Sequence, residues 1–188
     1  MKLRALILLG ILLSSVGAQT AEHWTPPVAA KKGKLQVAAY QAQLAGDILV
    51  IRVTHEAGWH TYALDNLERA KKKAGEPPLG IEKNTQLAVS GGLKVVGKWR
   101  QSVPKDLSQP EINWLTWGFE GVTFFAVKVE RTSGAEAVIT INGQGCQATT
   151  CVMIDDLEIR LPLHDTPREA AKIDLTALVE EGDLTGVK

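Results

Sequence analysis

The stretch "VTFFAVKVERTSGAEAVITING", residues 122–143, holds two apolar, β-branched runs on either side of a polar turn. Residues 122–130 and 137–143 are rich in Val, Ile, Thr and Phe, which is typical of β-strands. The "RTSGAE" segment between them contains a Ser-Gly turn signal. Because strands joined by a short turn pair antiparallel, this stretch predicts a β-meander.

Similar runs, bounded by turn residues, lie on both sides of this stretch. Apolar or alternating patterns predict strands at residues 35–43, 47–55, 58–64 and 157–163, and a hairpin about Gly91-Gly92 within residues 85–99. Short strands at this spacing, about seven or eight in about 130 residues, are typical of an antiparallel β-sandwich. The predicted fold class is therefore all-β.

The N-terminus has the pattern of an export signal. Lys2 and Arg4 precede the apolar run 5–13, and Val16 and Ala18 are the small residues of a cleavage site after Ala18. The run is shorter than the roughly 18–20 apolar residues of a membrane-spanning helix, so a cleaved signal peptide is predicted and stable membrane insertion is not. The predicted location is periplasmic or secreted.

The predicted organisation is a signal peptide at 1–18, an exposed leader at 19–34, the sandwich at 35–164 and a C-terminal helical tail at 165–188. In the tail, Thr166 is suited to cap a helix, Pro167 to occupy its first position and Glu169 to complete a capping box. The polar segment 65–78, which ends in two prolines, predicts a solvated loop, with a single helical turn as the alternative.

Overall charge indicates no nucleic-acid partner. The chain carries 21 Lys and Arg against 21 Asp and Glu, so its formal net charge is zero. A nucleic-acid-binding domain usually carries a basic excess. Because the net charge does not indicate a partner, a functional site has to be identified from individual residues.

The only two cysteines, Cys146 and Cys151, lie in "GQGCQATTCVMID" at residues 143–155. An even count in an exported chain fits one intrachain disulfide, because disulfides persist outside the cytosol. The strands on either side of the pair are neighbours in sequence, so the cysteines should bracket a hairpin-like connection. A structural bond, part of a metal site and a redox pair are all compatible with this placement.

Energetics and local chemistry distinguish between the structural, metal-binding and redox interpretations of the cysteine pair. A bridge closing about six residues stabilises a fold by only roughly 2 kcal/mol, which weakly favours a redox role over a structural one. No Lys, Arg or His lies in "QATT", and Asp155 and Asp156 would raise a thiol pKa, so the pair suits a passive carrier attacked by another protein's thiolate. The four histidines have no defined metal-ligand spacing, and no hydrolase serine motif is present.

The order of these features is similar to that of a known family. An apolar strand leads into "GWHTYAL" (58–64), an aromatic-rich loop precedes "VTFFAVKV" (122–129), and a strand leads into "GQGCQATTC" (143–151) before a final "LEIRLPL" (157–163). This order resembles the N-terminal periplasmic domain of DsbD, the thiol:disulfide interchange protein, from about residue 35 to 164. The resemblance implies an immunoglobulin-like β-sandwich.

The resemblance also implies roles for individual residues. Cys146 and Cys151 would be a redox pair that takes electrons from a membrane-embedded partner and passes them to periplasmic acceptors. Tyr62 would pack beside the pair, and His60 stands where the family often has a second aromatic residue. Core or sheet-surface packing is the alternative role for both side chains.

The family shields its disulfide with a cap loop, and residues 113–121 match that loop best. Trp114, Trp117 or Phe119 would then cover the sulfurs, with core packing as the alternative for each. The chain departs from the family in continuing "CVMIDD" after Cys151, where prolines are common, and in its shorter cysteine spacing. With no membrane region in the sequence, electrons would pass to or from separate proteins.

Two hypotheses follow from the sequence. The first is a periplasmic thiol–disulfide interchange carrier that needs no cofactor and works with thioredoxin-like proteins or membrane thiol oxidoreductases, with Cys151 as the attacked sulfur. The second is a secreted β-sandwich binding or scaffold module whose disulfide is purely structural. In that case the Trp114–Phe119 surface would bind the partner.

Overall fold

The computed structural model describes residues 24–74, 83–164 and 174–187. The strands are β1 Val28–Lys32, β2 Leu35–Ala45, β3 Ile48–His55, β4 His60–Tyr62, β5 Gln86–Gly91, β6 Leu93–Val95, β7 Arg100–Ser102, β8 Lys105–Asp106, β9 Trp117–Phe119, β10 Val122–Arg131, β11 Glu136–Gln147, β12 Thr150–Pro162 and β13 Leu178–Glu180. The helical segments are α1 Asn66–Ala74 and the single-turn 3₁₀ helices η1 Pro110–Ile112 and η2 Leu175–Ala177.

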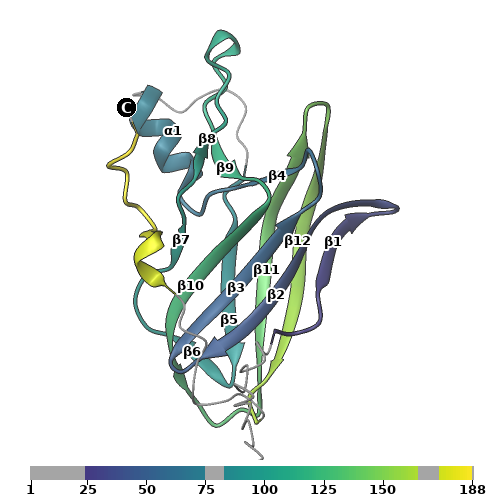
Figure 1. Ribbon diagram of the computed structural model, residues 1–188, viewed down its shortest axis with the longest axis vertical. Helices are drawn as coiled ribbons and strands as arrows, with labels where there is room; N and C mark the ends of the chain where they lie inside the picture. The colour runs from purple at the N-terminus through teal and green to yellow at the C-terminus, as the bar shows by residue number, and fades with distance from the viewer. Residues whose placement is uncertain (1–23, 75–82, 165–173, 188) are drawn as a thin grey trace, which may run out of the picture.

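The strands form two antiparallel sheets that pack face to face (Figure 1). One sheet has the order β1-β2-β3-β10-β7-β13, with β6 also paired to β10. The other has the order β12-β11-β4-β9-β8, with β5 also paired to β11. The predicted immunoglobulin-like antiparallel β-sandwich is confirmed.

The β-meander predicted for residues 122–143 is wrong, because its two strands belong to different sheets. β10 pairs with β3, β6 and β7, whereas β11 pairs with β12, β4 and β5. The turn between them therefore crosses from one sheet to the other. Local sequence has the same pattern for a hairpin turn and for such a crossing, and pairing partners distant in sequence decide between them.

The predicted hairpin about Gly91-Gly92 is a second crossing, since β5 and β6 also lie in opposite sheets. The two crossings pack against each other. The Gly92 N–H donates to the Glu136 carbonyl at 2.7 Å, and the Thr132 N–H donates to the Gly92 carbonyl at 2.9 Å. A Cβ on Gly134 would lie 2.7 Å from the Gly92 Cα, so only glycine allows this approach.

The core fills the space between the sheets with apolar side chains from both. Ile51 and Phe125 from one sheet and Ile139 and Ile141 from the other are fully buried. Phe119 packs edge-on against Phe125, with ring centroids 5.5 Å apart. Burial of such side chains contributes roughly 1.5–3 kcal/mol each to folding.

The loop predicted for residues 65–78 is also wrong in part, because residues 66–74 form α1. The helix buries Asn66, Arg69 and Ala70, so two of its three buried side chains are polar. Asp65, just before the helix, accepts hydrogen bonds from the Arg69 guanidinium at 2.7 and 3.0 Å. The segment is mostly polar and carries three lysines in its last turn, a composition that is also typical of a solvated loop.

Residues 24–34, expected in an exposed leader, join the sandwich instead. β1 pairs with β2, and Ala30 is buried. The predicted signal peptide lies outside the described residues. Among the described residues, no helix is long and apolar enough to cross a membrane.

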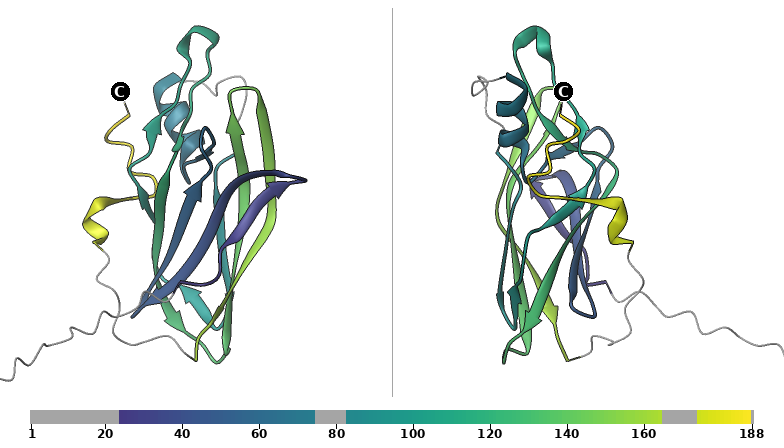
Figure 2. Two further views of the ribbon diagram at one scale, coloured as in Figure 1. Left: turned by 45° about the vertical axis from the view of Figure 1, so that its right-hand side comes forward. Right: turned by 90° about the vertical axis from the view of Figure 1, so that its left-hand side faces the viewer.

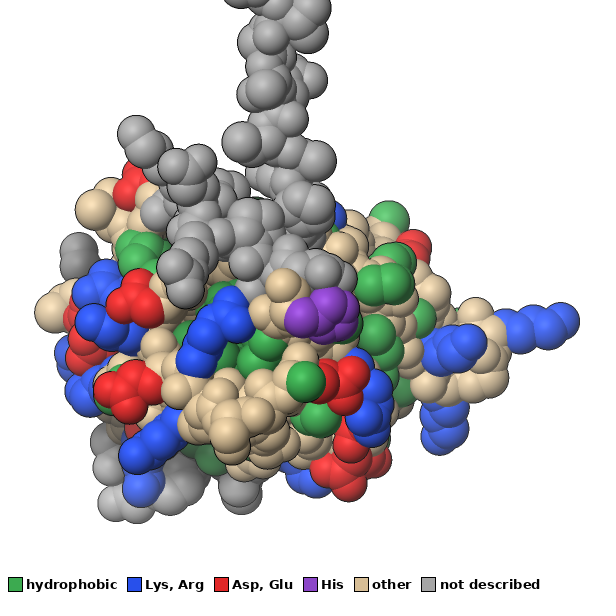
Figure 3. Space-filling model, turned by 90° about the horizontal axis from the view of Figure 1, so that it is seen from below, with side chains coloured by type: hydrophobic (Ala, Val, Ile, Leu, Met, Phe, Trp, Pro, Cys, Tyr) green, Lys and Arg blue, Asp and Glu red, His purple; other side chains and the backbone are tan. Residues whose placement is uncertain are grey.

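The predicted start of the C-terminal helix at Thr166 lies outside the described residues. The described tail holds η2 and then β13, which pairs with β7 and so extends the sheet. Val187 is buried against the core, and Figure 2 shows the tail running along the side of the sandwich toward α1. In the end view of Figure 3, opposite the β11–β12 hairpin tip, acidic and basic side chains are interspersed.

Candidate functional site

The two cysteines lie opposite each other near the tip of the β11–β12 hairpin. The two strands pair from Glu136↔Pro162 to Gln147↔Thr150, and within this ladder Cys146 pairs directly with Cys151. Their Cα atoms are 4.1 Å apart and their sulfurs form a disulfide. The predicted hairpin-like placement is confirmed.

The two sulfur-bearing residues differ in their access to solvent. Cys146 is only 2% exposed, whereas Cys151 is exposed. β11 is flanked on its other side by β4, while β12 stands at the end of the described sheet. An incoming thiolate can therefore reach the sulfur of Cys151 more readily, with Cys146 as the leaving group.

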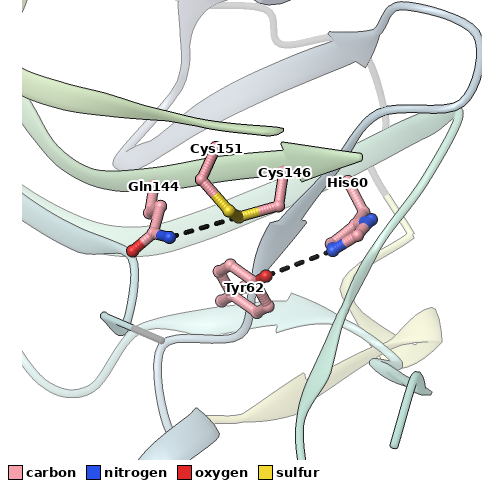
Figure 4. The surroundings of a disulfide bond; sticks show 5 residues. All are labelled: His60, Tyr62, Gln144, Cys146 and Cys151. Atoms are coloured by element: carbon pink, nitrogen blue, oxygen red, sulfur yellow. Dashed lines mark hydrogen bonds between the residues drawn. A yellow bond between two sulfur atoms is a disulfide. The ribbon is translucent and has the colours of Figure 1, made fainter. Parts of the chain in front are cut away.

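β4 brings His60 and Tyr62 to the disulfide. His60 pairs with Cys146 and Thr61 with Gly145, so strand alternation places His60 and Tyr62 on the face that carries the cysteines. Figure 4 shows both side chains beside the sulfurs. The His60 Nε2 and the Tyr62 hydroxyl are 3.1 Å apart, and the two rings meet edge-on at 5.4 Å.

Two of the three expected cap residues face away from the sulfurs. Thr61 pairs with Phe119, which places Phe119 on the opposite face of the sheet from Cys146. There it packs on Phe125 in the core. Trp117 follows the same alternation, is 4% exposed, and lies 5.3 Å beneath the Lys73 ammonium. The expectation that either residue covers the disulfide is wrong.

The third expected cap residue, Trp114, lies in the turn region of the β8–β9 hairpin. It is half-buried and exchanges backbone hydrogen bonds with Gln109 at 2.6 and 3.1 Å. In Figure 1 this hairpin and the β11–β12 hairpin project separately from the same end of the sandwich. A covering role for Trp114 stays a prediction.

The sequence analysis missed Gln144. Its side-chain amide Nε2 lies 3.2 Å from the Cys146 Sγ and donates to it (Figure 4). Gln144 is two residues before Cys146 on the same strand, so the alternation of the strand was the signal that could have revealed it. Its partner across the ladder is Met153, which is 41% exposed beside Cys151.

The electrostatic surroundings of the pair are close to neutral. Burial lowers the pKa of His60, against a weaker opposing effect of Glu120, which favours the uncharged ring at neutral pH. Asp156, at a bulge in β12, accepts from the Asn142 side-chain amide through its carboxylate at 3.2 Å, and its backbone N–H donates to the Asn142 Oδ1 at 2.8 Å. Asp155 is exposed. Nothing in this arrangement strongly activates a thiol.

The histidines near the site do not form a metal centre. The His55 Nδ1 donates to the Gly121 carbonyl at 2.8 Å, and its Nε2 lies 2.8 Å from the Thr61 hydroxyl, on the face opposite His60. Within the described ranges, no group of three or more His, Cys, Asp and Glu side chains is arranged to hold a metal.

The family model of the thiol:disulfide interchange protein DsbD, N-terminal, matches residues 33–163, which is more than half of the chain. The chain belongs to this DsbD N-terminal family. Comparison with curated protein sequences gives no significant match.

Solved structures that are similar to the chain include two N-terminal domains. The N-terminal periplasmic domain of ScsB from Proteus mirabilis is 16% identical, with 83% of this chain and 56% of that chain covered and a TM-score of 0.51. The Neisseria meningitidis DsbD N-terminal domain in the reduced form is 11% identical, with 77% of this chain and 90% of that chain covered and a TM-score of 0.44. At such identities the likeness to the ScsB domain concerns the fold alone.

Proposed function

We propose that the protein is a periplasmic thiol–disulfide interchange carrier that passes electrons through the Cys146–Cys151 disulfide. Its partners are separate thioredoxin-like proteins or membrane thiol oxidoreductases. The observation that carries this proposal is the unequal exposure of the two cysteines in a domain of the DsbD N-terminal family. One sulfur is open to a partner, and the other is held inside the sheet.

The exchange proceeds through a mixed disulfide. A partner thiolate attacks the Cys151 sulfur, the bond to Cys146 breaks, and Cys146 leaves with the electron pair as a thiolate. A second thiol of the partner then attacks its own sulfur in the mixed disulfide and releases Cys151. The partner is thereby oxidised by two electrons and the carrier is reduced. The reverse sequence delivers the electrons to an acceptor disulfide.

The neutral surroundings support a passive role in this exchange. Neither Cys151 nor its ladder partner Cys146 is paired with a Lys or Arg in the sheet, so an attacking thiol at Cys151 gains no electrostatic activation from these strands and reacts slowly with small disulfides. A partner that supplies its own activated thiolate removes this barrier. The exposed Met153 beside Cys151 offers such a partner an apolar contact.

Single-cysteine variants test the proposal. Cys146→Ser retains the exposed thiol of Cys151, and Cys151→Ser retains the buried thiol of Cys146. Each is mixed with a thioredoxin whose resolving cysteine is replaced and whose attacking cysteine carries an aromatic thiol leaving group. We expect covalent adduct formation with Cys146→Ser, and adduct formation at least about tenfold slower with Cys151→Ser, because Cys151 is exposed and Cys146 is buried.

The double variant Cys146→Ser/Cys151→Ser is the control and should form no adduct. Equal slow reaction of both single variants would contradict the proposal. If, in addition, the double variant only loses about 2 kcal/mol of stability, the disulfide is a structural bond and the protein is a binding or scaffold module.

A further inference from the structure

In the proposed exchange, a negative charge forms on the buried sulfur of Cys146. When a partner attacks Cys151, the electron pair of the broken bond passes to the Cys146 sulfur, which becomes a thiolate. Cys146 is only 2% exposed, so water hardly solvates this charge. Burial without a compensating group disfavours a thiolate and would slow the exchange.

The two residues paired with Cys146 in the ladder, Cys151 and His60, bring no fixed positive charge to its sulfur, and Lys105 on the same face is paired with Glu120 at 3.0 Å. From β4, His60 lies opposite Cys146 and is directed to the Tyr62 hydroxyl. From β12, strand alternation places the exposed Asp155 on the same face as Cys151, and a carboxylate there opposes a thiolate. Stabilisation must therefore come from a hydrogen-bond donor.

Gln144 is such a donor. Its side-chain N–H donates to the Cys146 sulfur at 3.2 Å, from two residues earlier on the same face of β11. The backbone between them is held in place, because a Cβ on Gly145 would lie 2.1 Å from the Val37 side chain of the facing sheet. A hydrogen bond to a charged acceptor is about twice as strong as one between neutral groups, so this contact strengthens when Cys146 becomes a thiolate.

We propose that Gln144 is a positioning residue of the exchange, whose amide holds Cys146 as the thiolate leaving group. This inference rests on the proposed function. The amide acts in both directions of electron flow, since Cys146 is the thiolate that leaves when the disulfide is attacked and the one that resolves a mixed disulfide at Cys151. No proton is transferred, and Gln144 is unchanged at the end of each cycle.

The first measurement is the titration of the Cys146 thiol in a Cys151→Ser background, followed by the ultraviolet absorbance of the thiolate. Gln144→Leu removes the donor, and Gln144→Glu replaces it with an anion of the same shape. We expect the midpoint of thiolate formation to rise by about one pH unit in Gln144→Leu, a tenfold change in the thiolate-to-thiol ratio, and at least as far in Gln144→Glu. The matched control Gln147→Leu, at the hairpin tip, should leave the midpoint unchanged.

The second measurement is the rate at which reduced thioredoxin reduces the two-cysteine protein. Gln144→Leu should slow this reaction by about threefold, because a leaving thiol of higher pKa leaves more slowly. Urea unfolding confirms that each variant is folded, and either variant at position 144 suffices for the comparison. A midpoint in both variants equal to that of Gln147→Leu would overturn the inference. If the parent disulfide does not react with thioredoxin, the proposed function fails, while the titration still decides the role of Gln144.

Discussion

His55 couples the stability of the sandwich to pH. Its ring is buried between the Gly121 carbonyl, which requires a donor at Nδ1, and the Thr61 hydroxyl at Nε2. Burial lowers its pKa below the ordinary value of 6.5, against weaker opposing effects of Gly121 and Glu120, and burial lowers the pKa of His60 as well. Both rings therefore favour the neutral form in the folded protein.

The free energy of unfolding should fall as the pH drops below about 6.5, because the unfolded chain then binds protons that the folded chain excludes. Above that pH both states carry neutral rings and the effect vanishes. Urea unfolding at about pH 7.5 and about pH 5.5 measures it. His55→Gln should be less stable at the higher pH but lose less stability on acidification. An unchanged pH dependence in His55→Gln and His60→Gln would contradict this assignment.

Asp65 is a buried carboxylate that accepts several hydrogen bonds. It accepts from Arg69, from the Gln101 amide at 2.8 Å and from the Gly182 N–H at 2.9 Å. We expect Asp65→Ala to destabilise the protein by about 3–5 kcal/mol in urea unfolding, because it leaves a buried guanidinium without its counter-charge.

Asp47→Ala is the control for this prediction. Asp47 is exposed and pairs with Lys128 at 3.3 Å, so its loss should cost about 0–1 kcal/mol. Equal losses in the two variants would show that the Asp65 network contributes no more than a surface ion pair.

At the scale of the elements, the two glycine-bearing crossings set which strands share a sheet. Because Gly134 and Gly92 touch backbone to backbone, β10 and β11 leave this corner in opposite sheets, and so do β5 and β6. The hairpin that carries the disulfide therefore lies in the sheet of β4 and not in that of β10. This placement is what brings His60 and Tyr62 to Cys146.

Gly134→Ala should reduce the free energy of unfolding by about 1–3 kcal/mol, since its Cβ would meet the Gly92 backbone at 2.7 Å. Gly186→Ala is a matched control, because no atom lies within 4 Å of its added Cβ. Its effect should stay within about 0.5 kcal/mol. Chemical denaturation of both variants measures these free energies of unfolding. If Gly134→Ala left the free energy of unfolding unchanged, the contact between Gly134 and Gly92 would contribute nothing to stability.

Strands such as β2, β3 and β10 could be predicted because each carries its own local pattern, whereas β1 and β13 lie in the expected leader and the expected helical tail. The cysteine pairing could be predicted because both residues lie in one hairpin. Which face of the sheet Trp117 and Phe119 occupy could not be predicted from the sequence. Their faces depend on the register between β9 and β4, and a shift of one residue moves every side chain to the other face. α1 escaped prediction for a similar reason, because its buried Arg69 is satisfied by the distant Asp183 carbonyl at 2.8 Å.

At the scale of the whole molecule, the C-terminal segment closes the side of the sandwich. β13 completes a sheet, Leu178 and Val187 are buried, and the Lys72 ammonium donates to the Leu184 carbonyl at 2.6 Å. Figure 2 shows this segment reaching from the sheet to α1. The tail thus belongs to the folded unit and holds the helix against it.

Truncation after residue 173 should lower the thermal midpoint and cost about 3 kcal/mol or more, because it exposes the partners of two buried apolar side chains and removes the Asp183 carbonyl that accepts from Arg69. Thermal unfolding followed by circular dichroism measures the shift. A truncated protein with the midpoint of the full chain would show that the tail is only attached to the surface.

The proposed function requires that the disulfide exchange electrons under periplasmic conditions. The direct measurement is its reduction potential, obtained by equilibrating the purified protein in glutathione buffers of graded ratio and counting free thiols. A carrier requires a potential above about −300 mV, within reach of thioredoxin-like partners, and this is the result we predict. A potential well below about −300 mV, together with no exchange with thioredoxin, would mark a structural bond and contradict the account.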